Sequence, residues 1–471
     1  MAAAIESAEV LKKLVGRYPA GTFARVLIDA SIAQQDGSVD RAIRLLERAT
    51  AIAAAPQIAY AVELLAPLYV MTGRYDAASD LLDRVSEMNA PLAALRAVVL
   101  SALGDSEAPA AVEAAEKLLM SEDDPLTAAR SLQRLALAAY HLHDHHAALA
   151  FSEASISWSH TIGAHRIMVT SYSIAYNVHH AVTGDIAEAR RCAIQMTEAA
   201  EAAGSRSYLT VGLVAQYEIA AELMDMADMK RLKAAIRRHS IPEQYRERFA
   251  CRLADYLPIA WSGDFEAFRA GVSVLTDASA TSRPAKALCA ALLALAAAAL
   301  GDVAEARRQS RAALHSATMH PVGEPAFDRR YRRLARALAV SACRIIGDNA
   351  RARRSATVKS LRSDVDHNAI VDAAAGDATG GRAPTRVAGY AEVVIAARRS
   401  AEVRGPSRLL TGAELEVLAA LADGARPLEI ALASSRSVRT IQAHTRSIFS
   451  KLDVHGVAAA AGRARTLGIL S

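Results

Sequence analysis

A short turn pattern that recurs along the chain constrains its fold more than any other feature. A glycine, often next to an aspartate, separates two apolar helical stretches, and the residue five positions later is small or apolar. The clear copies are Gly37 with Ala42, Gly73 with Ala78, Gly184 with Ala189, Gly301 with Ala306 and Gly347 with Ala352, and weaker ones lie at Gly104, His143 with Ala148, Ala227 with Leu232 and Gly263 with Phe268. Their mean spacing of roughly 39 residues is typical of stacked helical hairpins.

The residue types in this turn explain how it joins two helices. A glycine ends the first helix in the left-handed conformation, an aspartate starts the next helix, and a small residue lets the two helices approach closely. The composition agrees, because 52% of the residues are hydrophobic but only 5% are aromatic, which favours closely packed helices over sheets. We therefore expect an all-α fold whose hairpins stack and leave an extended inner surface.

The division of the chain follows from where this pattern stops. The stretch Gly73-Arg74-Tyr75-Asp76-Ala77-Ala78 resembles a tetratricopeptide repeat, so we expect residues 1–362 to form a tetratricopeptide-like α-solenoid. Its inner surface would bind an effector: a protein, a peptide or a small molecule. Residues 363–407 are rich in Gly, Ala, Asp and Thr and are interpreted as a linker, in which Tyr390–Val403 could form one more helix. Residues 408–471 would form a second domain.

One amphipathic stretch near the C-terminus, SVRTIQAHTRSIFSKL from Ser437 to Leu452, has the features of a DNA-recognition helix. Ser437 is a good N-cap. On a period of 3.6 residues one face carries Val438, Ile441, Thr445, Ile448 and Leu452, and the other carries Arg439, Ala443, Arg446 and Ser450 with Gln442 beside them. A small residue between two arginines and an amide lets a helix lie close in a major groove and reach bases and phosphates.

The residues around this helix form a longer spaced pattern. It runs Leu410-Thr411, Glu414-x-Glu416-Val417-Leu418, Gly424, Glu429-Ile430-Ala431, the helix itself, Lys451-Leu452 and a closing Gly468-Ile469-Leu470. This pattern resembles the LuxR-type helix-turn-helix domain, which implies a four-helix module that binds double-stranded DNA in a transcription regulator. The combination with helical repeats is similar to MalT-like regulators, but their nucleotide-hydrolysing module is missing, since no GxxxxGK[ST] phosphate loop exists.

The resemblance also implies roles for individual residues. The base-reading and backbone-touching positions of the family match Gln442, Ala443 and Arg446, with Arg439 on the same face. Its phosphate-side positions match Thr440, His444 and Lys451, and His444 could equally be structural. Thr440 could equally serve only as a polar residue of the first turn. The family dimerises on its last helix, where this chain has a stripe of small residues, and homodimers on DNA are expected; packing within the module is the alternative. The stripe consists of Val457, Ala460, Ala461, Ala464 and Leu467.

A different class of function remains open because the module departs from the family pattern. Ser434 and Arg436 stand where the family usually has leucine and isoleucine, and Ala413 and Val457 stand where arginines are common. The module has eight Lys and Arg against five Asp and Glu, a net charge of +3, so one copy would bind DNA weakly. The alternative is a tetratricopeptide-like interaction scaffold with a degenerate module that no longer binds DNA.

Other features of the sequence point away from catalysis and membranes. No nucleophile and base stand together, so we expect neither an enzyme nor a cofactor. The four cysteines are far apart within apolar helical patterns, the 14-residue apolar run Ala287–Leu300 is too short to span a bilayer, and the first residues do not form a signal peptide. These features predict a cytoplasmic, nucleoid-associated protein without a membrane segment.

Two clusters of one residue type each allow a structural and a functional interpretation. The histidines at 141, 143, 145, 146, 179 and 180 are interpreted as polar turns between helices rather than as a metal site, since no Cys or ordered Glu spacing accompanies them. The arginines at 329, 330, 332, 333 and 336 are interpreted as a solvated helix face rather than as a second nucleic-acid site.

Overall fold

Helices make up all the regular secondary structure in the described part of the chain, which confirms the expected all-α fold. The computed structural model describes residues 8–239, 245–278, 283–318, 326–348, 351–352, 368, 370–373, 387–404, 410, 412–466 and 469–470. By contacts between residues, the chain divides into one unit of Met1–Ala254 with His320–Arg330 and a second unit of Asp255–Met319 with Tyr331–Ser471. The domain boundaries expected from the sequence stay a prediction, and each unit is described by itself.

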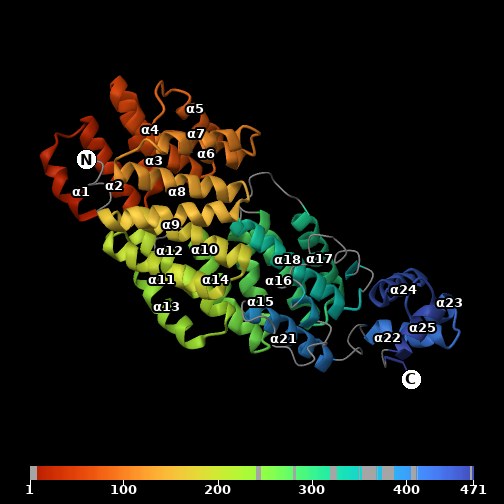
Figure 1. The fold of residues 1–471 in the computed structure, drawn as a ribbon. Helices are drawn as coiled ribbons and strands as arrows, with labels where there is room; N and C mark the ends of the chain where they lie inside the picture. Colours follow the sequence, from red (N-terminus) through yellow and green to blue (C-terminus); the bar gives the residue numbers. More distant parts are fainter. Residues whose placement is uncertain are drawn as a thin grey trace. The chain divides into compact units, whose positions relative to one another are not determined.

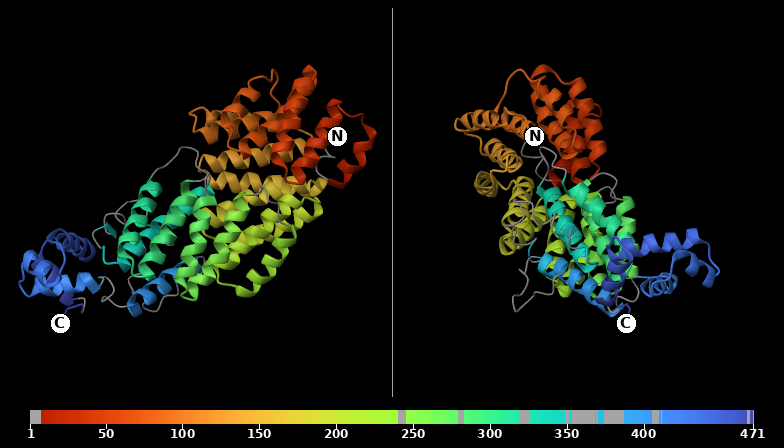
Figure 2. Two further views of the ribbon diagram at one scale, coloured as in Figure 1. Left: turned by 180° about the vertical axis from the view of Figure 1, so that it is seen from behind. Right: turned by 90° about the vertical axis from the view of Figure 1, so that its right-hand side faces the viewer.

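The first unit is a succession of antiparallel helices, each packed against its neighbours in the chain (Figures 1 and 2). Its helices are α1 (Ala8–Leu14), η2 (Val15–Arg17), α2 (Phe23–Gln35), α3 (Val39–Ile52), α4 (Ala55–Met71), α5 (Tyr75–Leu82), α6 (Ala90–Leu103), α7 (Ala108–Leu119), α8 (Pro125–His141), α9 (His145–Ile162), α10 (His165–Val178), η3 (His179–Thr183), α11 (Ile186–Ala202), α12 (Arg206–Glu222), α13 (Met226–His239) and most of α14 (Tyr245–Trp261). The helices α4, α6, α8 and α10 also pack side by side, with α4 against α6, α6 against α8 and α8 against α10. This arrangement fits a region of repeated helical hairpins; the tetratricopeptide resemblance stays a prediction.

The recurring turn has the expected backbone conformation at nearly all its copies. Its central residue lies in the left-handed region, with φ between 67° and 87° at Gly37, Gly73, Gly104, Gly184, Gly263, Gly301, Gly347 and His143. The aspartate that follows accepts a hydrogen bond from a backbone amide of the next helix, as at Asp185, Asp264, Asp302, Asp348 and Asp144. The turn therefore ends one helix and caps the next within two residues.

The residue five positions after the turn is buried between the two helices. Ala42, Ala78, Ala148, Ala189 and Ala306 are all fully buried, as is Phe268 in its copy. One expected copy is out of register: the left-handed residue before α13 is Met224, with φ of 59°, and not Ala227. Its buried partner in the pattern is Met229 rather than Leu232, although Leu232 is buried too. The sequence pattern did not identify Met224 as the turn residue of this copy, because a methionine occupies the place of the glycine.

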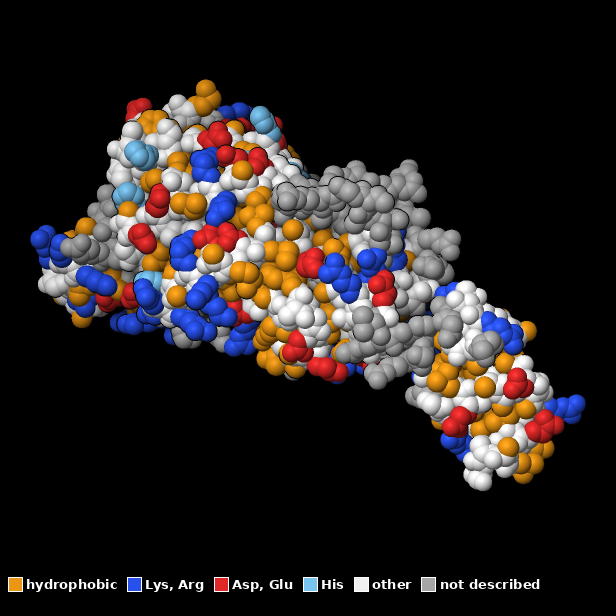
Figure 3. Space-filling model, turned by 90° about the horizontal axis from the view of Figure 1, so that it is seen from below, with side chains coloured by type: hydrophobic (Ala, Val, Ile, Leu, Met, Phe, Trp, Pro, Cys, Tyr) orange, Lys and Arg blue, Asp and Glu red, His pale blue; other side chains and the backbone are white. Residues whose placement is uncertain are grey.

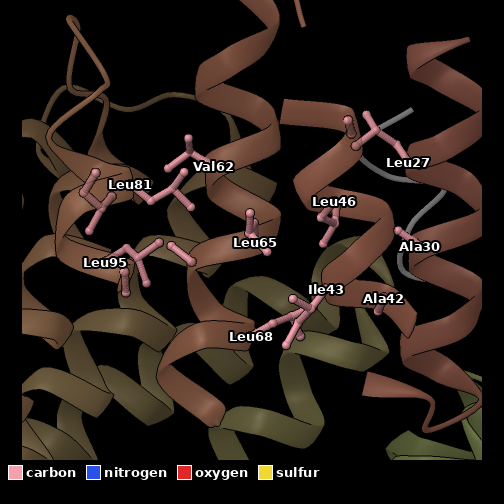
Figure 4. Close-up of a cluster of buried hydrophobic side chains, with 14 of the residues drawn as sticks. Leu27, Ala30, Ala42, Ile43, Leu46, Val62, Leu65, Leu68, Leu81 and Leu95 are labelled. Atoms are coloured by element: carbon pink, nitrogen blue, oxygen red, sulfur yellow. The ribbon is translucent and has the colours of Figure 1, made fainter. Parts of the chain in front are cut away.

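The apolar core of the first hairpins illustrates how these turns are used. Aliphatic side chains from α2, α3, α4, α5 and α6 meet in one cluster (Figure 4). Leu27 and Ala30 of α2 face Ile43 and Leu46 of α3, and Leu65 of α4 lies between them and the later helices. Small and medium-sized side chains fill this core, as the low aromatic content predicts.

The second unit continues the helical hairpins and carries the C-terminal domain. Its repeat helices are α15 (Phe265–Ala278), α16 (Arg283–Ala299), α17 (Val303–Thr318), α18 (Ala326–Ile345) and α21 (Ala388–Arg404). Helix α16 contains the apolar run up to Ala299 and is largely buried along it, as expected for a core helix. No described helix is long and apolar enough to cross a membrane.

The segment interpreted as a linker contributes to the packing of the repeats. Helix α21 packs against α16, and the indole Nε1 of Trp261 donates a hydrogen bond of 2.8 Å to the carbonyl of Gly389. Ile370 and Val371 are also buried, and their carbonyls accept hydrogen bonds from Ser341 and Arg344. Most of residues 363–386, and residues 405–407, lie outside the described part.

The arginine run on α18 is not a solvated helix face. Arg332 and Arg336 are 8% and 7% exposed, and the Arg330 guanidinium pairs with the buried carboxylate of Glu222 on α12. The same carboxylate lies 2.9 Å from Nε2 of His180, whose ring stacks on Tyr176. Burial works to raise the pKa of Glu222, but Arg330 and His180 outweigh it and hold the pKa below its ordinary value. The interpretation was wrong for these three arginines because tertiary packing covers them.

Replacing the turn glycine should cost stability through the backbone alone. Gly73 has φ of 75°, and no other atom lies within 4 Å of the place that a Cβ would take. Gly73→Ala therefore meets no clash but retains an unfavourable left-handed conformation, and we expect a loss of about 1–2 kcal/mol in urea unfolding. Gly16→Ala is the matched control, since Gly16 also has open space but no positive φ. An equal loss in both variants would contradict this explanation.

The Glu222 cluster should make stability depend on pH. A carboxylate whose pKa is depressed by folding stabilises the native state above its unfolded pKa, and this contribution is lost as the pH falls through the folded pKa. Near pH 7 we expect Glu222→Gln to cost about 3 kcal/mol, because Arg330 loses its buried partner. The difference in unfolding free energy between Glu222→Gln and the unchanged protein should become smaller as the pH falls below 4.5, the ordinary pKa of a glutamate.

Thermal unfolding at a series of pH values measures this difference. Glu188→Gln is the control, because Glu188 forms an exposed pair with Arg191 on one helix and its loss should change stability little. A difference between Glu222→Gln and the unchanged protein that stayed constant with pH would show that the charge of Glu222 does not matter.

Candidate nucleic-acid interface

The C-terminal domain is a compact bundle of four helices, as expected. They are α22 (Gly412–Ala422), α23 (Pro427–Ala433), α24 (Val438–Leu452) and α25 (Val457–Thr466). Helix α22 packs against all three others, and α24 packs against α23 and α25. The shared core consists of Leu410, Val417, Leu418, Leu421, Ile430, Ala431, Ile441, Ile448, Leu452, Ala460 and Ala464. Thr411 and Gly468 of the sequence pattern lie outside the described residues.

Helix α24 begins and ends as the sequence predicts for the recognition helix. The hydroxyl of Ser437 accepts a hydrogen bond of 3.1 Å from the backbone amide of Thr440, which confirms Ser437 as the N-cap. The hydroxyl groups of Ser437 and Thr440 are also bonded to each other, at 2.8 Å. The helix ends at Asp453, which adopts the left-handed conformation with φ of 56°. Both ends are therefore fixed by local interactions.

The two faces of α24 differ as the period of the sequence predicts. Ile441, Ile448 and Leu452 are buried in the core of the domain. The opposite face is exposed over two turns and carries most of the predicted DNA-contacting residues, namely Arg439, Thr440, Gln442, Ala443 and Arg446. Neither Arg439 nor Arg446 forms an ion pair with another described residue, and Nε of Arg446 donates to the carbonyl of Gln442 at 3.3 Å. The helix thus presents two guanidinium groups, an amide and a small residue in one row.

Lys451, the remaining residue predicted to contact DNA, lies at the edge of this face. Its ammonium is 2.6 Å from the carboxylate of Glu414 on α22, and Glu414 also accepts a hydrogen bond of 2.6 Å from Ser447. The side chain of Glu414 is only 5% exposed, whereas that of Lys451 is 22% exposed. The pair therefore fixes α24 to α22, while part of the lysine remains in contact with solvent. The sequence pattern included Glu414 but gave no sign of this partner.

The turn between α23 and α24 is closed by polar groups where the family usually has apolar ones. Ser434 donates its hydroxyl to the carbonyl of Ile430 at 2.6 Å, and the next residue, Ser435, is left-handed with φ of 54°. Arg436 bonds through its amide to the carbonyl of Ala431 and pairs with Glu416 on α22 at 3.5 Å. The turn keeps its shape through hydrogen bonds, so Ser434 and Arg436 do not break the helix-turn-helix geometry.

The stripe on α25 that was predicted to pair two copies is divided between core and surface. Ala460 and Ala464 are fully buried in the core of the domain, and Ala461 is 6% exposed. Ala460 and Ala464 pack within the module, where small residues let α25 lie close to α22. Leu467 lies outside the described residues. Val457 is 36% exposed and remains accessible. Dimerisation stays a prediction, and it would have to use Val457 and its exposed neighbours.

The described residues offer little other reactive chemistry. Burial raises the pKa of the Cys192 thiol to about 11 and that of the Cys289 thiol to about 12, which makes both thiols poor nucleophiles. No group of three or more His, Cys, Asp or Glu side chains in the described ranges is placed to hold a metal ion. On the face of the molecule in Figure 3, acidic and basic side chains are interspersed with apolar ones.

Comparison with known proteins supports the role of the C-terminal domain. Residues 408–464 match the GerE family model, described as bacterial regulatory proteins of the luxR family. The match covers all of α22, α23 and α24 and most of α25, and it does not extend into the helical repeats. No match to the chain was found among curated proteins.

The pair between Glu414 and Lys451 should stabilise the position of α24. Lys451→Met leaves the buried carboxylate of Glu414 without its cation, so we expect a loss of about 3 kcal/mol. Replacing both residues, with Glu414→Leu added, should recover most of that loss because no buried charge remains. Hydrogen exchange of the α24 amides in the full chain measures this local stability.

A matched control comes from a second ion pair of the same domain. Glu416 pairs with Arg436, but its side chain is 69% exposed, so Glu416→Gln should alter the exchange of α24 only slightly. If Lys451→Met changed the exchange no more than Glu416→Gln, the pair would not hold the helix.

Proposed function

We propose that this protein is a DNA-binding transcription regulator that acts through its C-terminal domain, a helix-turn-helix domain of the luxR family. The observation that carries the proposal is the exposed row on α24, with Arg439, Gln442, Ala443 and Arg446 turned to solvent while the opposite face is held in the core. A helix of this kind fits the major groove of double-stranded DNA, where base edges are accessible.

Each side chain of the row has a distinct task in this proposal. Arg446 reads a guanine through two hydrogen bonds or grips a phosphate, and the amide of Gln442 pairs with an adenine. Ala443 is small enough to let the helix axis approach the bases. Arg439 and Thr440 lie in the first turn of α24, where the helix N-terminus and polar side chains favour a backbone phosphate.

Lys451 has two roles in this proposal. Its ammonium has three donor hydrogens, and the contact with Glu414 takes one of them. A second donor can reach a phosphate at the edge of the groove. Because Glu414 fixes the direction of the Lys451 side chain, Lys451 would hold α24 in place and would also contact DNA at the edge of the bound segment.

A single domain has few charges for such a task. Its net charge of +3 allows few phosphate contacts, and each contact adds to affinity and to the dependence of binding on salt. We infer that two copies bind together, as a homodimer on two half-sites, which doubles the number of contacts. The helical repeats would receive an effector and change the DNA binding of the pair.

Replacing Arg446 should weaken the recognition of specific DNA. We expect Arg446→Ala to cost about 1–3 kcal/mol in binding to the sequence that the full chain selects from a random pool, and to relax preference at one base position. Arg465→Ala is the control, since Arg465 is also exposed but lies on α25. Gel-shift titration at several salt concentrations measures both.

Two results would count against the proposal. If the full chain selected no sequence and bound no duplex at low salt, it would not be a DNA-binding regulator. If instead Arg446→Ala and Arg465→Ala weakened binding equally at every sequence, Arg446 would be removed from the base-reading residues.

A further inference from the structure

The first unit contains a pocket of about 420 Å³ among the inner helices of its repeats. Most of its lining comes from α4, α6, α8 and α10, with single residues from α2 and α5 and two from α12. On α8 the lining includes Gln133, Leu137 and His141, and on α10 it includes Thr170, Ser173 and Asn177. Steps of three and four residues place each set on one face of its helix, so the pocket follows the inner surface of the stacked hairpins.

One end of this pocket is cationic. Arg130 lies in the first half of α8, Arg134 lies just past its middle, and Arg166 is the second residue of α10. Because α9 runs back between these two helices through short connections, α8 and α10 are parallel and the three guanidinium groups belong to the same end. Arginine at such a position suits a carboxylate, since its planar fork gives two parallel hydrogen bonds.

Contacts with neighbouring helices hold these arginines in place. Arg134 donates to the carbonyl of Pro91 at 2.8 Å and to Oε1 of Glu63 at 3.3 Å. Arg130 lies 3.6 Å from the same Glu63 oxygen, and Arg166 donates to Oε1 of Gln34 at 2.6 Å. The cationic end is thus built from α2, α4, α6, α8 and α10, and its arginines are held by contacts within the protein.

Arginines outnumber carboxylates in the lining at this end. Among the lining residues three arginines face one carboxylate, that of Glu63. Burial lowers the pKa of Arg134, and the positive charges of Arg130 and Arg166 lower it further, while Glu63 acts in the opposite direction. The guanidinium groups are therefore close enough to repel each other in a partly desolvated site, and an added anion would relieve that repulsion.

The rest of the pocket is largely apolar. Leu64, Pro67 and Met71 line it along α4, and Leu137 of α8 and Ile174 of α10 line the neighbouring helices. Most of these residues lie beyond the arginines along the helices, and Tyr140, His141 and Asn177 add polar groups at the far end. A ligand that fills the pocket needs an anionic group at the arginine end and a largely apolar body beyond it.

We propose that this pocket binds a small organic carboxylate with an apolar body, and that this molecule is the effector of the regulator. Its volume lies within the range of about 300–1,000 Å³ that is usual for small-molecule sites. A peptide or another protein would use the longer inner surface instead. The role as effector rests on the proposed function, but the binding itself does not.

The test compares head groups on one apolar chain. Octanoate, 1-octanol and octylammonium, and the matching hexyl and decyl compounds, are titrated into the full chain by calorimetry and by thermal unfolding. We expect at least one carboxylate to bind about tenfold more tightly than its alcohol and to raise the unfolding temperature, and the ammonium compounds not to bind. If no carboxylate bound more tightly than its alcohol, the proposal would be overturned.

Variants of the pocket show where the carboxylate binds. Arg166→Gln should weaken binding of the carboxylate about tenfold, because the carboxylate loses one charge–charge contact. Binding of the uncharged alcohol, which does not form this contact, should stay unchanged. Arg191→Gln is the matched control, since Arg191 is an exposed arginine of the same unit that does not line the pocket. Equal weakening in both variants would contradict a site at Arg166.

Two further measurements keep the outcome clear. Ser173→Phe fills the pocket without removing a charge and should abolish binding of the carboxylate, whether or not Arg166→Gln folds. DNA binding of the unchanged protein is measured with and without the carboxylate. Carboxylate binding without any DNA binding would refute the proposed function alone, whereas DNA binding without carboxylate preference would refute the pocket alone.

Discussion

The close approach of two helices at each left-handed turn is the constraint on which the rest of the structure depends. A residue with positive φ ends one helix, an aspartate caps the next helix at several copies, and the residue five positions on is buried at most of them. Because each turn fixes the relation of two helices locally, the hairpins can stack with a core of small aliphatic side chains. The same stacking aligns α4, α6, α8 and α10 and so creates an inner surface from residues that are far apart in the sequence.

Polar groups inside this apolar framework have different consequences according to their partners. The buried carboxylate of Glu222 pairs with His180 and with Arg330, and the expected effect of this cluster is on stability. The arginines around Glu63 line a pocket in which they outnumber the carboxylates, and we propose that their effect is on what binds there. A similar contrast holds in the C-terminal domain, where Lys451 pairs with buried Glu414 while Arg439 and Arg446 face solvent.

The departures of the C-terminal domain from its family pattern concern the turn more than the exposed face of α24. Ser434, Ser435 and Arg436 close that turn through hydrogen bonds and an ion pair with Glu416, in place of an apolar plug. The exposed row on α24 is unaffected, because its direction is set by the Ser437 cap, the buried Ile441 and Ile448, and the Glu414 contact. A domain whose turn between α23 and α24 has fewer apolar contacts, but whose row on α24 remains exposed, is compatible with DNA binding.

The sequence by itself determined the helical class, the turns and the two faces of α24, because these depend on periods and caps within a few residues of each other. It placed Ser437 as the N-cap and the α16 run as a buried helix, and it missed the turn at Met224, where a methionine replaces the glycine. Only the tertiary structure decided which polar residues meet: Lys451 with Glu414, Arg330 with Glu222, and Arg134 with Glu63. These partners are separated by tens of residues, and no local pattern records which distant charge a buried side chain will face once the helices have packed.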